Sequence, residues 1–142
     1  MPTIIATGTS LAGLKADIQA GRHRFVADEP VALGGLDRGP APFDYLLAAL
    51  GACTVMTLRL YASRKGWPLD AVDVKLHHAV RASSAQRDVF SREIHLIGEL
   101  STEQRARLLE IAERCPVGRT LAAGVDIQST LAADAPIGEA GA

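Results

Sequence analysis

The sequence contains two cysteines, Cys53 and Cys115, and their thiols are its clearest candidates for chemistry. A thiolate is a nucleophile, and two thiols that meet can be oxidised to a disulfide and reduced again. Cys53 lies in the nearly all-apolar run AALGACTVMTL, residues 48–58, where it also fits as a small buried hydrophobe. The spacing alone is compatible with both interpretations of Cys53, an inert packed thiol and a reactive one.

The predicted surroundings of the two thiols differ. Cys53 falls about ten residues into a predicted helix, too far from the helix N-terminus for the dipole to stabilise a thiolate. Cys115 directly precedes Pro116, near the start of a short helix whose free backbone N–H groups favour a thiolate. A reactive Cys53 therefore requires a cation from elsewhere in the fold. The upstream candidates are Arg22, Arg24 and Arg38.

The helix that carries Cys53 is predicted over residues 43–65, because Pro42 can open it and Gly66 and Pro68 can end it. Its apolar residues recur at a spacing of three or four, and the opposite face is Ala, Val and Met. A helix that is apolar all round should be buried all round, so we expect a second subunit to help cover it. The predicted inward stripe is Phe43, Leu46, Leu47, Leu50, Cys53, Thr54, Thr57, Leu60 and Tyr61.

Strands are predicted on both sides of this helix. Residues 3–10, 14–20 and 22–27 have strand character, and the Gly- and Pro-rich segment 28–42 is predicted to be a loop. Alternating apolar residues over 70–80 and 89–100 predict two antiparallel strands joined by a turn.

The C-terminal third is predicted to hold two helices and a last strand. Ser101 and Gln104 form a capping-box pattern that begins a helix near Thr102. A short helix is expected from Pro116 to residue 123, and a strand over 125–131. The inward stripe of the first of these helices is Leu108, Ile111, Ala112 and Cys115. We therefore expect one domain over residues 1–131 and a flexible tail over 132–142.

Composition narrows the function classes. The net charge of −1 and the 4% aromatic content disfavour nucleic acid as a partner. The uncharged run between Asp44 and Arg59 is shorter than the ~20 residues that cross a bilayer. No secretory signal is evident, so we expect a cytoplasmic protein that does not associate with a membrane. His77 and His78 are adjacent on a strand and face opposite ways, and His78 is expected in the core rather than on a metal.

Two long segments resemble a known family. ADEPVALGGLDRGPAPFDYLLAALGACTVMTLRLYASRKGWPL and EQRARLLEIAERCPVGRTL are similar to the OsmC/Ohr family of thiol-dependent hydroperoxide reductases, and the resemblance spans roughly residues 27–131. It implies an α+β, OsmC-like fold in which antiparallel sheets wrap around two long central helices in an intertwined homodimer.

The resemblance also implies a chemistry. Cys53 would be the peroxidatic thiol that attacks an organic hydroperoxide and becomes a sulfenic acid, and Cys115 would resolve it to a disulfide. An external dithiol, in the family often a lipoylated protein, would restore the thiols. No cofactor and no metal are implied. The apolar residues around Cys53 favour organic peroxides over hydrogen peroxide.

The sequence departs from the family pattern around the implied site. The family usually has glutamate after the loop proline, whereas here Phe43 follows Pro42 and Asp44 comes one position later. The family's activating arginine has no counterpart at its usual position, so Arg24 or Arg38 would substitute. Gly118 stands where the OsmC-like branch often has histidine.

These departures keep other functions open. The alternative to an oxidative-stress peroxidase is an OsmC-fold protein that binds a small molecule in an apolar pocket at the dimer interface and has little peroxidase activity. A purely structural dimer is the third possibility.

Overall fold

The computed structural model describes residues 3–133, and this part of the chain divides into two units. The first contains residues 3–45 and 127–133, and the second contains residues 46–126. The predicted tail over 132–142 lies mostly outside the described residues, so the domain limit at residue 131 stays a prediction.

The first unit holds a three-stranded antiparallel sheet in the order β1–β2–β3. Its strands are β1 (Ile4–Thr7), β2 (Ala16–Ala20) and β3 (His23–Ala27), so all three predicted strands are confirmed in shorter form. Gly21 makes the tight β2–β3 turn with a φ of 59°, which glycine adopts without steric cost. A short 3₁₀ helix, η1 (Ser10–Ala12), occupies the β1–β2 connection.

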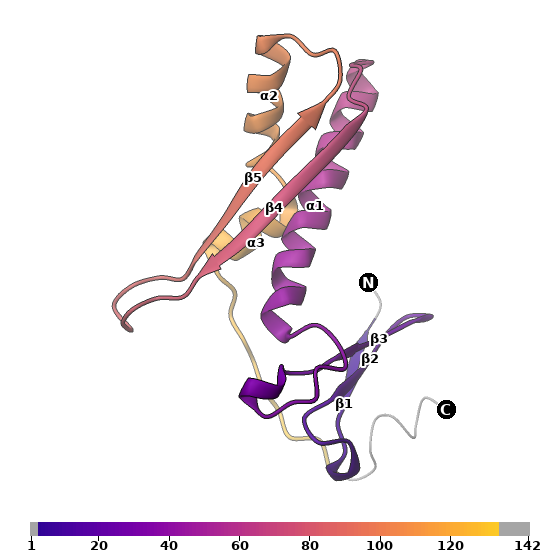
Figure 1. Cartoon of the computed structure of the whole chain (residues 1–142), viewed down its shortest axis with the longest axis vertical. Coiled ribbons are helices and arrows are strands. Elements are labelled where there is room, and N and C mark those ends of the chain that lie inside the picture. The colour runs from indigo at the N-terminus through magenta and orange to yellow at the C-terminus, as the bar shows by residue number, and fades with distance from the viewer. Residues whose placement is uncertain (1–2, 134–142) are drawn as a thin grey trace. The chain divides into compact units, whose positions relative to one another are not determined.

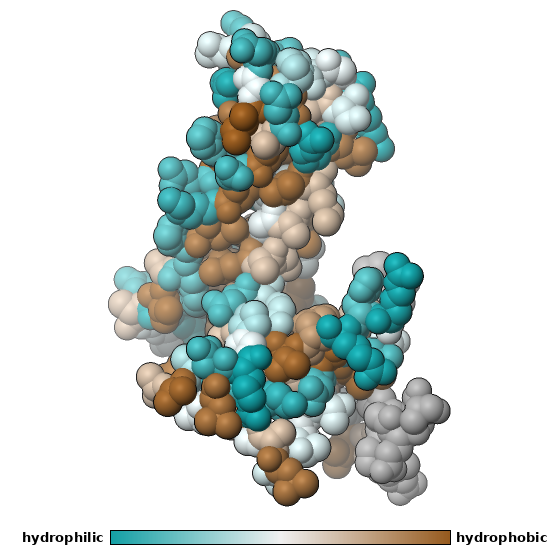
Figure 2. Space-filling view, turned by 45° about the vertical axis from the view of Figure 1, so that its right-hand side comes forward, coloured by the Kyte–Doolittle hydropathy of each residue, from teal (hydrophilic) through white to brown (hydrophobic). Residues whose placement is uncertain are grey.

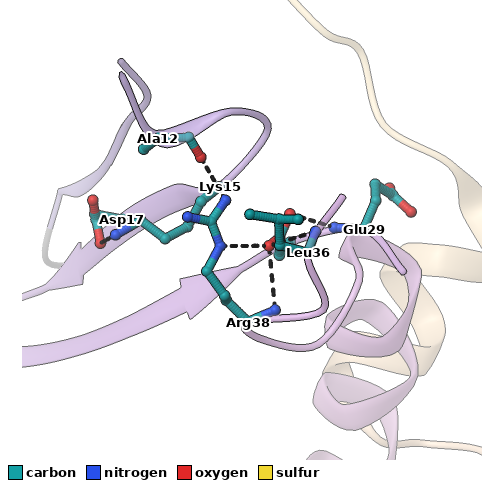
Figure 3. A network of polar contacts seen from close by, with 7 residues as sticks. Ala12, Lys15, Asp17, Glu29, Leu36 and Arg38 are labelled. Carbon is teal, nitrogen blue, oxygen red and sulfur yellow. Dashed lines mark hydrogen bonds and ion pairs between the residues drawn. The ribbon is translucent and has the colours of Figure 1, made fainter. Parts of the chain in front are cut away.

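The predicted loop after β3 is ordered by one buried carboxylate (Figure 3). Asp28 accepts hydrogen bonds from the backbone N–H groups of Glu29, Leu36 and Arg38, at 2.9, 3.3 and 3.2 Å, and from the Arg38 Nε at 3.0 Å. Burial raises the pKa of Asp28, but these donors, the Arg38 side chain first, lower it to about 2. The loop also contains a 3₁₀ turn, η2 (Val31–Leu33), that the sequence did not predict.

The second unit combines a β-hairpin with three helices (Figure 1). Strands β4 (Ala71–Ala79) and β5 (Val89–Ile97) pair antiparallel, as predicted. The helices are α1 (Pro42–Lys65), α2 (Thr102–Ala112) and α3 (Pro116–Ala123), with the first residues of α1 in the first unit. The core joins α1 to α2 and is flanked by hairpin residues such as Ile94. Its buried members are Leu58, Ala62, Leu69, Leu108, Ile111 and Ala112.

The helix boundaries follow the predicted signals. Ser101 and Gln104 form both hydrogen bonds of a capping box at the start of α2. Cys115 is the N-cap of α3, and Pro116 is its first residue. Gly66 follows α1 with a φ of 69°, the left-handed conformation typical of a helix end.

Two expectations are corrected. The strand over 125–131 was wrong, because this segment is irregular and exposed, and alternation alone cannot form a strand without a paired neighbour. The inward stripe of α1 is right for Leu50 and Thr54, which are buried. It is wrong for Phe43, Leu46 and Leu60, which are 51%, 40% and 52% exposed.

Much of the apolar surface of α1 is thus uncovered in the single chain. Met56, also on α1, is 69% exposed, and Figure 2 shows hydrophobic side chains at the surface on the face in view. Among residues 3–133, α1 is the one helix long and apolar enough to span a membrane, a property that core helices of soluble proteins share. Residues 3–133 contain one long helix, so within this part of the chain a pair of central helices would require a second copy.

Candidate functional site

The two cysteines come together in the second unit. Cys53 lies in the middle of α1 and is partly exposed, whereas Cys115, at the N-cap of α3, is fully buried. Both are free thiols, and the Cys53 side chain is among the groups that lower the pKa of Cys115. The Cys53 Sγ also lies 4.0 Å from the Thr57 hydroxyl, one turn further along α1. Two residues 62 positions apart in sequence therefore lie in the same site, where Arg92 binds both Thr54, the residue after Cys53, and the Cys115 sulfur.

The surroundings of Cys115 favour its thiolate. Burial raises the pKa of Cys115, but four hydrogen bonds outweigh it and the net shift is downward. The largest of these is from the Gly118 N–H, which donates to the sulfur at 3.2 Å, and the next is from Arg92, whose Nη1 donates at 3.5 Å. The Cys53 and Thr54 side chains contribute less. The prediction that free N–H groups at the start of α3 act on Cys115 is confirmed for Gly118.

Arg92 connects the two cysteine-bearing helices. It extends from β5, and its Nη1 also donates to the Thr54 hydroxyl at 2.9 Å. Thr54 in turn donates to the Leu50 carbonyl, one turn back on α1, at 2.7 Å. The Arg92 Nη2 lies 3.7 Å from an oxygen of the exposed Glu113. Arg92 therefore has its guanidinium held in place beside the Cys115 sulfur.

Sequence reasoning missed Arg92, although a signal was present. In β5 the partly buried residues alternate with exposed ones, and Arg92 occupies an inward position between Phe90 and Ile94. A cation on the inward face of an amphipathic strand requires an internal partner. The partners were not evident, because Thr54 and Cys115 are distant in sequence.

Gly118 allows α3 to approach the sulfur closely. A Cβ at this position would lie 3.0 Å from the Cys115 Sγ, 3.4 Å from the Leu50 side chain and 3.6 Å from the Arg92 Nη1. The glycine that replaces the family's frequent histidine is therefore closely surrounded by the residues of the site.

The other predicted site residues have different contacts. Asp44, in the first turn of α1, accepts the backbone N–H of Ala41, the residue before that helix, at 2.9 Å, so it binds the start of α1. Arg24 is exposed on β3, where it pairs with Gln19. The Arg38 side chain donates hydrogen bonds to Asp28 and to the Ala12 carbonyl, so it helps to order the loop after β3. All three belong to the first unit, and their roles at Cys53 stay predictions.

A surface hollow borders the thiol pair. Its volume is about 870 Å³, and its lining includes Leu50, Arg92 and Gly118. Leu50 contacts Thr54, whereas Arg92 and Gly118 contact the Cys115 sulfur. Arg81 and Arg87, from the β4–β5 connection, also line it. The hollow combines apolar and charged groups next to the candidate site.

The histidines do not form a metal site in the described part of the chain. Among residues 3–133, no group of three His, Cys, Asp or Glu side chains is arranged to hold an ion. His78 faces inward, as predicted, where its ring contacts Phe90 and its Nε2 lies 3.3 Å from Asp88. The Arg81 N–H and then His78 lower the pKa of Asp88.

Solved structures have the same fold. A protein from Psychrobacter arcticus, described as an osmotic stress induced and detoxification response protein, is 19% identical with a TM-score of 0.71, covering 84% of this chain and 87% of that one. An organic hydroperoxide resistance protein OsmC from Legionella pneumophila is 20% identical with a TM-score of 0.65 and the same coverages.

A third solved structure also has this fold. An organic hydroperoxide resistance protein from Vibrio cholerae, with captopril bound in one of its active sites, is 16% identical with a TM-score of 0.63. The alignment covers 89% of this chain and 88% of the Vibrio cholerae protein. No curated protein matches the sequence.

The family model described as OsmC-like protein matches residues 35–130, which include Cys53, Arg92 and Cys115. This match covers well over half of the chain. The protein belongs to the OsmC-like family.

Proposed function

We propose that this protein is a thiol-dependent peroxidase that reduces organic hydroperoxides through Cys53 and Cys115. The observation that carries the proposal is that both thiols lie in one site, where Arg92 binds Thr54, the residue after Cys53, and the Cys115 sulfur. Cys53 is partly exposed there, and Cys115 is buried beside the cation. Family membership and structural neighbours named organic hydroperoxide resistance proteins support a role in peroxide defence.

The proposed cycle has three steps. The Cys53 thiolate attacks the outer oxygen of the hydroperoxide and the O–O bond breaks. Cys53 becomes a sulfenic acid, and the alkoxide that leaves takes a proton from water to become an alcohol. The Cys115 thiolate then attacks the Cys53 sulfur, and the hydroxyl leaves as water after taking a proton. A dithiol finally reduces the Cys53–Cys115 disulfide and is itself oxidised to a disulfide.

The substrate preference follows from the surroundings of Cys53. Leu50 and Val55 lie three residues before and two residues after Cys53 on α1, and Met56 adds exposed apolar surface. An alkyl tail that packs on such side chains gains about 25 cal/mol for each Å² of apolar surface removed from water. Hydrogen peroxide has no tail to bury, so it is the poorer substrate in this proposal.

A homodimer is part of the proposal. The exposed apolar residues of α1 require a cover in water, because contiguous apolar surface of this kind is typical of protein interfaces. A second copy of α1 would supply it, as the family resemblance implies. Light scattering after size-exclusion chromatography should then give twice the chain's mass of 15.0 kDa.

One experiment tests the peroxidase proposal against a binding function. Reduced protein is mixed with one equivalent of cumene hydroperoxide, and the remaining thiols and hydroperoxide are counted over time, with hydrogen peroxide in parallel. We expect both thiols and the hydroperoxide to disappear together, and more slowly with hydrogen peroxide. Thiols that persist for minutes would overturn the proposal and favour the small-molecule binding protein, for which the exposed apolar surface of α1 provides the supporting observation.

A further inference from the structure

The two thiols of the site are electrostatically unequal. The Cys115 sulfur accepts from a backbone N–H and from a guanidinium, at 3.2 and 3.5 Å. The Cys53 sulfur lies 4.0 Å from the Thr57 hydroxyl, an uncharged group. The charge that stabilises a thiolate is therefore placed on the proposed resolving cysteine, and this asymmetry bears on how the disulfide is reduced.

We infer that Arg92 sets the direction of disulfide reduction by holding the Cys115 sulfur as a thiolate leaving group, so that an incoming thiolate attacks the Cys53 sulfur. This inference rests on the proposed two-cysteine cycle. In the step, a bond forms between the reductant sulfur and the Cys53 sulfur while the Cys53–Cys115 bond breaks. The electron pair of the broken bond goes to Cys115, which needs no proton to leave. A second thiolate of the reductant then releases Cys53 and closes the reductant's own disulfide.

The contacts of Arg92 fit a leaving-group role. Its Nη1 bonds Thr54, and its Nη2 is near Glu113, so the guanidinium has two partners other than the sulfur. These partners hold the cation in place when the sulfur is neutral in the disulfide, and the charge that develops on Cys115 meets a preorganised donor. Leaving-group thiols that are more stable as thiolates leave faster.

Solvent access to the two sulfurs also favours attack of the reductant at Cys53. Cys115 has no exposed surface, whereas Cys53 is partly exposed. A thiol from solution therefore reaches the Cys53 sulfur first. Access does not depend on Arg92, however, so variants of Arg92 separate the electrostatic contribution from the steric one.

The test reads which sulfur is attacked, without any peroxide. The reduced protein is oxidised with diamide to form the disulfide and then reacted briefly with 2-mercaptoethanol, a thiol with no charged group other than its reacting thiolate. The reaction is stopped in acid and the free thiols are alkylated. Peptide mass spectrometry then locates 2-mercaptoethanol on Cys53 or Cys115, and the initial rate of attack is measured.

In the unmodified protein we expect 2-mercaptoethanol on Cys53 and the alkyl label on Cys115. Arg92→Met should slow the attack by about three- to tenfold, because a hydrogen bond to a charged group stabilises it by roughly tenfold or more. Arg92→Lys should restore part of the rate. The matched control is Arg107→Met, which removes another partly buried arginine of the same unit, one bound to Tyr61 and Glu110, and should leave the rate unchanged.

A second readout is independent of the disulfide. In Cys53→Ser protein the thiolate of Cys115 is followed by its absorbance near 240 nm as a function of pH. Adding Arg92→Met should lower the thiolate fraction at neutral pH by about tenfold, whereas a merely structural role would leave it unchanged.

The outcomes separate this inference from the proposed function. Attack at Cys115, an Arg92→Met rate equal to that of the unmodified protein, or failure of diamide to join the two thiols would overturn the inference. A protein that shows the expected pattern but consumes no hydroperoxide would support the inference and refute the peroxidase proposal.

Discussion

Thr54 accepts a hydrogen bond from Arg92 at 2.9 Å, and the same nitrogen of Arg92 donates to the Cys115 sulfur. Thr54 directly follows Cys53, so the sequence neighbour of one thiol shares a cation with the other. The relationship couples α1, β5 and the start of α3 at one point. It also makes the hydroxyl of a buried threonine part of the site.

The first prediction concerns this hydroxyl. Thr54→Val keeps the shape of the side chain but removes the acceptor of Arg92, and we expect the free energy of unfolding to fall by about 1–3 kcal/mol. The thiolate fraction of Cys115 should also fall, because Thr54 is one of the groups that lower its pKa. Urea unfolding and the absorbance titration measure the two effects. Thr120→Val, at an exposed position on α3, is the control, and equal behaviour of the two variants would contradict the prediction.

The second prediction concerns the close approach at Gly118. In Gly118→Ala the new Cβ would lie 3.0 Å from the Cys115 sulfur, so the sulfur or the helix must shift. We expect a loss of stability of about 1–3 kcal/mol from overpacking and slower disulfide formation with diamide. The exposed Thr120→Ala on the same helix should change neither. Unaltered disulfide kinetics in Gly118→Ala would show that the approach is not critical.

The third prediction concerns the loss of stability at acidic pH that Asp28 causes. The pKa of Asp28 is about 2 in the folded protein and about 3.9 in an unfolded chain, so Asp28 stabilises the fold above about pH 4. That contribution is lost as the pH falls from about 4 towards 2. Asp28→Asn should be less stable at neutral pH and should lose less stability over this interval.

Urea unfolding at several pH values between 2 and 6 provides the measurement for Asp28. Asp37→Asn is a matched control in the same loop, because Asp37 is exposed and asparagine tolerates its positive φ of 53°. The Asp37 variant should follow the unmodified protein at every pH. If Asp28→Asn did the same, the carboxylate network would not order the loop as described.

The fourth prediction tests the core that supports the site. Leu108→Ala deletes a fully buried side chain between α2 and α1 and should cost about 2–5 kcal/mol in the free energy of unfolding. The neighbouring Leu109 is 58% exposed, so Leu109→Ala should change stability little. Similar losses in both variants would mean that α2 packs differently.

Much of this fold could be predicted from the sequence, because its signals are local. Pro42 opens α1, Ser101 caps α2 and Pro116 starts α3, each at the predicted position. The irregular segment 125–131 shows the limit: its alternation resembles that of a strand, but pairing depends on a neighbour that a local pattern cannot specify.

The candidate site was predicted in part. The two cysteines are predicted by residue type and by family resemblance, and the structure places them in one site linked through Thr54 and Arg92. Arg92 was missed, since its partners come from α1 and from the N-cap of α3, far away in sequence. The sequence-based candidates are upstream arginines such as Arg24 and Arg38, whereas the guanidinium that contacts the Cys115 sulfur comes from Arg92 in β5.

The most direct test of the central claim is to trap the sulfenic acid. Cys115→Ser and Cys53→Ser proteins are each given one equivalent of cumene hydroperoxide in the presence of dimedone, and the modified residue is identified by mass spectrometry. The proposed cycle predicts a dimedone adduct on Cys53 in Cys115→Ser, with loss of one equivalent of hydroperoxide, and no adduct in Cys53→Ser. An adduct on Cys115 in the Cys53→Ser protein, or hydroperoxide that survives in both, would contradict it.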